Sequence, residues 1–132
     1  MLLAGPGYPQ VVQYERDVPL TGRAPKAARD ALTPLSAVIP ADRLSDIKLV
    51  VSELVTNAVQ HSGLAEGTPI HLSVSQSLGK VRIEVSEPGF AAFPRPQPGE
   101  AVSGRGLYIV TQASDRWGQI PDDGIWAEFD LP

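Results

Sequence analysis

The 132-residue chain contains no cysteine and has few charged residues for its length. The absence of cysteine excludes disulfide scaffolds, iron–sulfur clusters and zinc sites built on thiolates, and it is compatible with a reducing cytoplasm. Charged residues make up 20 % of the chain, with 11 basic and 15 acidic side chains and a net charge of -4. This balance argues against a partner bound mainly through phosphate-backbone charge, so we expect no direct nucleic-acid contact.

The chain also lacks an apolar run of the ~18–20 residues that a membrane helix needs. Residues 1–5 contain neither the basic region nor the apolar segment of a signal peptide. Hydrophobic residues nevertheless make up 42 % of the chain, which together with the small net charge can support a buried core. We therefore expect one soluble, cytoplasmic domain over residues 1–132, without a membrane segment.

The positions of the thirteen prolines predict where helices lie, because an interior proline removes a helix hydrogen bond. Residues 41–68 and 99–120 contain no proline, so both stretches are helix candidates. In the first stretch, Asp42 is the expected N-cap and Gly63 the expected C-cap. The apolar residues between them recur on one arc that should face the core. This arc comprises Leu44, Ile47, Val51, Leu54, Val55 and Ala58.

Alternating apolar and polar residues predict two hairpins in the second half of the chain. The further expected elements are a shorter helix over residues 25–35, bent or ended near Pro34, and strands over residues 11–16, 70–75, 81–86, 116–120 and 125–131. Hairpins favour a mostly antiparallel, mixed sheet with the helices on one face, which is a two-layer α/β (α+β) sandwich. Residues 88–103 are rich in proline and fit no element, as is typical of a functional lid or a disordered loop.

Glu53 and Asn57 lie four residues apart on the long predicted helix and therefore share one side of it. They flank the apolar arc, opposite a stripe that we expect to be solvated, formed by Lys48, Ser52 and Thr56. A carboxamide oxygen can bind a hard cation, and a carboxylate can polarise a water or hydroxyl group. The alternative is that both are ordinary polar residues at the edge of the core.

Two glycine motifs follow. Gly104 and Gly106 open the helix predicted after the proline-rich loop, and free amides at a helix N-terminus suit phosphate. Residues 87–89, with the sequence EPG, directly follow a predicted strand. Taken alone, the first motif is also compatible with a simple loop-to-helix turn and the second with a simple turn.

In this order, the three motifs resemble the N, G1 and G2 boxes of the GHKL (Bergerat-fold) ATP-binding superfamily. The resemblance extends over about residues 23–129 and is closest to the small bacterial anti-sigma-factor serine kinases and their regulatory relatives. The segments that carry it are residues 53–61 (ELVTNAVQH), 87–89 (EPG) and 104–110 (GRGLYIV), supported by 52–58 (SELVTNA) and 113–118 (ASDRWG).

The resemblance implies a Bergerat ATP-binding fold with ATP and Mg²⁺ at the site. It implies that Glu53 acts as general base or orients the attacking group, and that Asn57 ligates Mg²⁺ bridging the phosphates. Residues 88–103 then form the ATP lid. The resemblance places Glu87 and Gly89 at the adenine and the amides of Gly104 and Gly106 at the triphosphate, with Leu107 also among the nucleotide-binding residues. Arg105 can either reach a phosphate or be solvated.

The chain departs from the family's D-x-G-x-G pattern in the G1 box. Glu87 replaces the aspartate, which keeps an acceptor but adds a methylene, so the adenine must shift or the backbone must adapt. Ala91 replaces the second glycine and restricts positive φ. His61 matches a frequent histidine of the N box, and we assign it no role. His71 is interpreted as an ordinary strand residue.

The leading hypothesis is an ATP-binding regulator that phosphorylates a serine of a partner antagonist protein and regulates transcription through protein contacts. The resemblance implies a sigma factor or its antagonist as partner, and dimers are common among the similar proteins, so a homodimer is one expected state. One alternative is a non-catalytic module of the same fold with weak or no nucleotide binding. Another is a detached catalytic domain of the histidine-kinase type.

Overall fold

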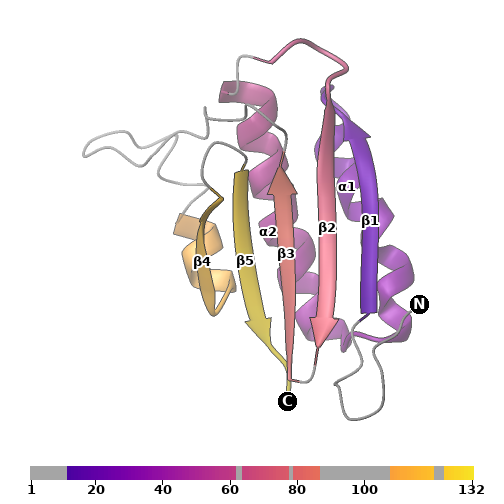
Figure 1. Cartoon of the computed structure of the whole chain (residues 1–132), viewed down its shortest axis with the longest axis vertical. Coiled ribbons are helices and arrows are strands. Elements are labelled where there is room, and N and C mark those ends of the chain that lie inside the picture. Colours follow the sequence, from indigo (N-terminus) through magenta and orange to yellow (C-terminus); the bar gives the residue numbers. More distant parts are fainter. Residues whose placement is uncertain (1–11, 62–63, 78, 87–107, 121–123) are drawn as a thin grey trace.

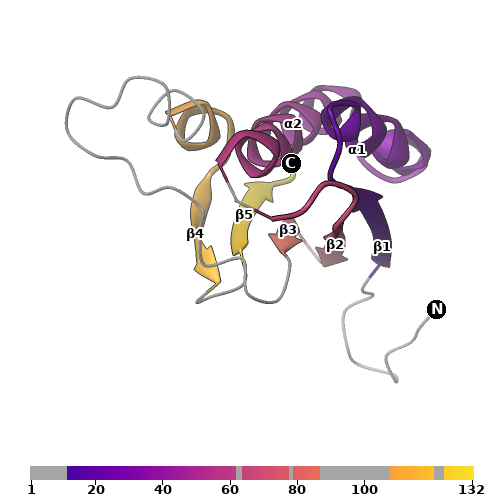
Figure 2. The same cartoon turned by 90° about the horizontal axis from the view of Figure 1, so that it is seen from above.

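In the computed structural model of the chain, five strands form one sheet, and the helices lie on one of its faces (Figures 1 and 2). The structure describes residues 12–61, 64–77, 79–86, 108–120 and 124–132. The strands are β1 (Val12–Pro19), β2 (Pro69–Ser77), β3 (Lys80–Ser86), β4 (Arg116–Ile120) and β5 (Gly124–Asp130). Their order is β1-β2-β3-β5-β4, and each pairing of these described strands is antiparallel. The predicted two-layer sandwich is confirmed.

Three helices precede the hairpins: α1 (Ala24–Leu32), the 3₁₀ helix η1 (Thr33–Ala37) and α2 (Ala41–His61). Residues 108–113 are also helical. Pro25 lies in the first turn of α1, and Pro34 begins the change to η1, as the sequence predicts. The predicted N-cap is wrong: α2 begins at Ala41, so Asp42 lies within its first turn, where the helix dipole favours a carboxylate. Gly63 lies outside the described residues.

The core is formed by one side of α2 and the inward-facing residues of the sheet. The six residues of the predicted apolar arc are at most 5 % exposed. Alternate residues of the strands meet them in one cluster, namely Ile70, Leu72, Val74, Val81, Ile83, Val85, Ile125, Ala127 and Phe129. Val110 belongs to the same cluster, so the helix over residues 108–113 is packed into this core.

The long helix α2 lies between α1 and the helix over residues 108–113 (Figure 2). On the α1 side, Arg29 donates a 2.7 Å hydrogen bond to the hydroxyl of Ser52, and Lys48 donates one of 3.0 Å to Thr33. The stripe that the sequence predicts to be solvated is therefore partly an interface with α1 and η1. This arrangement leaves the other side of α2 to face residues 108–113.

Candidate functional site

The side of α2 that faces residues 108–113 carries Glu53 and Asn57. At 100° per residue, both lie on the opposite side of the apolar arc from Ser52, whose hydroxyl binds α1. One helical turn separates the two side chains, so they are neighbours. The structure thus places both residues at the edge of the core, on the side of α2 nearest the helix over residues 108–113, which follows the Gly104 and Gly106 motif.

Asn57 is buried, with only 4 % of its surface exposed, and it is the one polar or charged side chain that is buried among the described residues. Its Nδ2 atom is buried and has no hydrogen-bond partner in the described part of the chain. Leaving a buried donor unpaired costs about 1–3 kcal/mol, because the group has lost its water. A bound molecule with an acceptor beside Asn57 would remove that cost. The sequence predicts Asn57 at the border of the apolar arc but does not predict this burial.

Glu53 differs from Asn57 because it is partly exposed. Within the described residues, its carboxylate forms no ion pair and no hydrogen bond. A carboxylate without a partner can accept a proton or orient a hydroxyl group of a bound molecule. The predicted pair therefore consists of a buried amide and an accessible acid.

Contacts of the helix itself and of the segment that follows it hold residues 108–113 in place. Val110 is fully buried in the core, and the Trp117 indole donates a 2.9 Å hydrogen bond to the hydroxyl of Thr111. Arg43 near the start of α2 lies 3.7 Å from the carboxylate of Asp115, just beyond the helix. Of these residues, Asp115 and Trp117 belong to the segment 113–118 that supports the resemblance, and their contacts lie just after the helix that follows Gly104 and Gly106.

The other residues predicted to contact nucleotide lie outside the described residues: Glu87, Gly89, Gly104, Arg105, Gly106 and Leu107, together with the lid over 88–103. Their neighbours along the chain are placed. β3 lies under α2 and ends at Ser86, and the described helix begins at Tyr108 (Figures 1 and 2). Both motifs are thus attached to elements that pack with α2, while their own contacts stay predictions.

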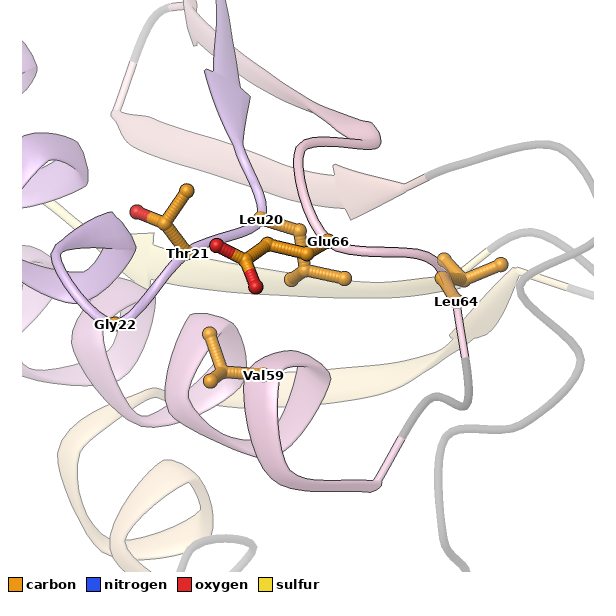
Figure 3. Close-up of a pocket in the computed structure, with 6 residues that line it drawn as sticks. All are labelled: Leu20, Thr21, Gly22, Val59, Leu64 and Glu66. Carbon is orange, nitrogen blue, oxygen red and sulfur yellow. The ribbon is translucent and has the colours of Figure 1, made fainter.

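A pocket of about 200 Å³ lies near the end of α2 but on its α1 side (Figure 3). Six residues line it: Leu20, Thr21, Gly22, Val59, Leu64 and Glu66. Val59 is two residues from Asn57 and hence about 200° around the helix from it. This pocket is therefore separate from the Glu53 and Asn57 pair.

Within the described residues, no group of three or more histidine, cysteine, aspartate or glutamate side chains could hold a metal ion. A cation at Asn57 would consequently need further ligand oxygens from a bound molecule. None of the described helices is long and apolar enough to cross a membrane.

Comparison with known proteins agrees with the fold and with the motifs. A sequence model of the histidine kinase-like ATPase domain matches residues 18–124, a range that includes Glu53, Asn57 and the two glycine motifs. A search of curated proteins found no match. Because the match extends over most of the chain, and the α+β architecture with its antiparallel sheet agrees with it, the chain belongs to the family of histidine kinase-like ATPase domains, whose fold binds ATP.

Proposed function

We propose that this protein binds ATP together with Mg²⁺ and transfers the γ-phosphoryl group to a serine of a partner protein, like the anti-sigma-factor serine kinases that it resembles. One observation carries the proposal: among the described residues, the buried Nδ2 of Asn57 has no hydrogen-bond partner, and Glu53 lies one helical turn away from it. Family membership supports ATP as the nucleotide. The resemblance of residues 52–58 and 113–118 to that class of kinase supports serine as the acceptor.

The carboxamide of Asn57 fits a nucleotide-bound Mg²⁺. Its oxygen is a suitable ligand for a hard cation, and its unpaired nitrogen can donate to a phosphate oxygen. Since the described residues contain no cluster of acidic ligands, we expect Mg²⁺ to bind only with the nucleotide, whose phosphates complete its coordination. When bound, Mg²⁺ would neutralise charge on the phosphates.

The proposed reaction needs little covalent chemistry from the protein. The hydroxyl oxygen of the partner's serine attacks the γ-phosphorus, forming an ester bond as the bond to the β,γ-bridging oxygen breaks. ADP leaves with that electron pair, and the hydroxyl proton moves to the carboxylate of Glu53. Catalysis of this kind depends mainly on positioning and charge stabilisation.

The proposed partner is a protein whose serine reaches Glu53, and the resemblance favours an antagonist protein in this role. The net charge of -4 is compatible with a protein partner and unfavourable for direct binding to DNA. We therefore propose that the chain regulates transcription through protein contacts.

Titration with ATP, with and without Mg²⁺, tests the binding half of the proposal. The wild-type protein should bind ATP more tightly with Mg²⁺, and Asn57→Ala should abolish this dependence. Glu53→Gln should keep the ATP affinity within a few-fold of the wild-type value, because it removes the charge of the side chain and leaves its shape nearly unchanged. Glu66→Gln is the matched control, because Glu66 lies at the separate pocket. Absence of ATP binding in the wild-type protein would instead support a module that does not depend on nucleotide.

The proposed phosphoryl transfer is tested by measuring phosphorylation of the acceptor protein. The protein can be incubated with extract of its own cells and a thiophosphate analogue of ATP, and labelled serines mapped by mass spectrometry. Glu53→Gln should lower labelling by ~10² or more, the usual scale for a general base. Glu66→Gln should label at the wild-type rate. Labelling that is equal in both variants, with ATP binding intact, would contradict a proton-transfer role for Glu53.

A further inference from the structure

His71 lies on the face of the sheet that the helices do not cover, and both of its ring nitrogens contact carboxylates of the edge strand β1. Nδ1 is 2.8 Å from Oδ1 of Asp17, the residue directly opposite in the strand register, and Nε2 is 2.8 Å from Oε1 of Glu15. An ionised carboxylate only accepts hydrogen bonds. Both contacts are therefore hydrogen bonds only when both ring nitrogens carry a proton, which is the imidazolium form.

The charged groups around His71 come from β1 on one side and β3 on the other. On β3, Ser86 stands opposite His71, and Glu84, the described carboxylate of β3 on the same face, accepts a 2.9 Å hydrogen bond from Arg82. On β1, Arg16 stacks on a tyrosine ring and does not contact His71. Among the described residues, the groups bound to the imidazole are thus the two carboxylates of β1.

We propose that His71, Glu15 and Asp17 form a proton-dependent clasp that fastens the edge strand β1 to β2. Each carboxylate lies on one side of the ring, so the clasp joins two alternate residues of β1 to one residue of β2. When the imidazole loses its proton, one ring nitrogen becomes an acceptor facing a carboxylate, and that half of the clasp opens.

The stability that the clasp adds depends on pH. The hydrogen bond to Asp17 is the main reason that the pKa of His71 is raised above its ordinary value, and Glu15 adds to it, while partial desolvation opposes both. A raised pKa means that the stabilisation is complete below the ordinary value of about 6.5 and is lost as pH rises through the higher value of the folded protein.

The position of β1 gives the clasp a structural consequence. β1 is at one edge of the sheet and pairs with β2 alone among the described strands. It also contacts α1, because the hydroxyl of Tyr14 donates a hydrogen bond to the carbonyl of Ala31. Deprotonation of His71 should therefore lower the local stability of β1, an effect that does not depend on the proposed kinase activity.

Nuclear magnetic resonance of the imidazole nitrogens in the intact protein tests the protonation state. At about pH 6 both nitrogens of His71 should be protonated, and its titration midpoint should lie above that of a histidine in a model peptide. Asp17→Asn combined with Glu15→Gln should return the midpoint to the peptide value, whereas Glu84→Gln, the matched control on the same face, should not. A neutral ring with one protonated nitrogen at that pH would overturn the proposal.

Hydrogen exchange tests the expected loss of local stability in β1. Protection factors of the β1 amides should fall between about pH 6 and about pH 8 by about two- to tenfold, as expected for two exposed charged contacts, while those of β5 stay constant. His71→Gln should remove this pH dependence. Protection of β1 that is equal at both pH values in the wild-type protein would refute the clasp, even if ATP binding is found.

Discussion

At the residue scale, the buried Nδ2 of Asn57, which has no partner among the described residues, should lower stability and favour ligand binding. Asn57→Leu keeps a similar volume and removes the polar group, so it should raise the free energy of unfolding without nucleotide by about 1 kcal/mol. It should also abolish Mg²⁺-dependent ATP binding. Chemical denaturation and ATP titration of the same variant measure both effects. A loss of stability would show that the amide is satisfied inside the protein and has a structural role.

Glu128 is the residue whose titration should matter most on the uncovered face. Its carboxylate, 14 % exposed, accepts hydrogen bonds of 3.0 Å from Arg116 and 3.3 Å from Arg82. The bond from Arg116 is the main reason that the pKa of Glu128 is lowered. A lowered pKa gives stability that is present above the ordinary value of about 4.3 and lost as pH falls through the lower folded value.

We therefore expect Glu128→Gln to lower the free energy of unfolding at neutral pH by about 1 kcal/mol and to reduce its fall below about pH 4. Denaturant unfolding at several pH values is the measurement. Glu66→Gln is the control, since its carboxylate has no ion pair among the described residues. Identical acid profiles for wild type and Glu128→Gln would show that the arginines do not stabilise this carboxylate.

At the scale of the elements, Gly124 decides how closely β5 approaches β3. A Cβ atom at Gly124 would lie 2.0 Å from the carbonyl oxygen of Val85, which the backbone cannot accommodate without moving. Gly124→Ala should therefore destabilise the protein by about 3 kcal/mol, measured by thermal or denaturant unfolding. Gly22→Ala is the matched control because no atom lies within 4 Å of its Cβ position, and it should change stability little.

The elements themselves could largely be predicted from the sequence. α2 could be predicted because its apolar arc and the absence of proline over residues 41–68 indicate the same helix. The hairpins could be predicted because apolar and polar residues alternate along their strands with a period of two. The start of α2 was predicted wrongly, with Asp42 as the N-cap, whereas the helix begins at Ala41. Helix boundaries depend on cap geometry that a residue type alone does not determine.

What could not be predicted depends on contacts between elements distant in the chain. Asn57 is buried on the side of α2 facing residues 108–113, and periodicity within α2 cannot reveal that neighbour. Ser52 and Lys48 bind α1 and η1 for the same reason. His71 looks like any polar strand residue until the register of β1 places Asp17 opposite it.

At the scale of the whole molecule, binding to the folded state alone should raise its stability. A ligand at a hundredfold excess over its dissociation constant stabilises by about 2.7 kcal/mol. For a domain of this size, we expect ATP with Mg²⁺ to raise the midpoint of thermal unfolding by about 10 °C. Differential scanning calorimetry at several ATP concentrations is the measurement.

Variants of Asn57 and Glu53 show which residue causes this shift of the unfolding midpoint. Omitting Mg²⁺ or replacing Asn57 by leucine should remove most of the shift, because each removes the link between the buried amide and the phosphates. Glu53→Gln should retain it, since Glu53 is expected to act on the acceptor's proton and not on ATP affinity. A shift that persists in Asn57→Leu would place ATP elsewhere on the molecule, and a shift that disappears in Glu53→Gln would make Glu53 a binding residue.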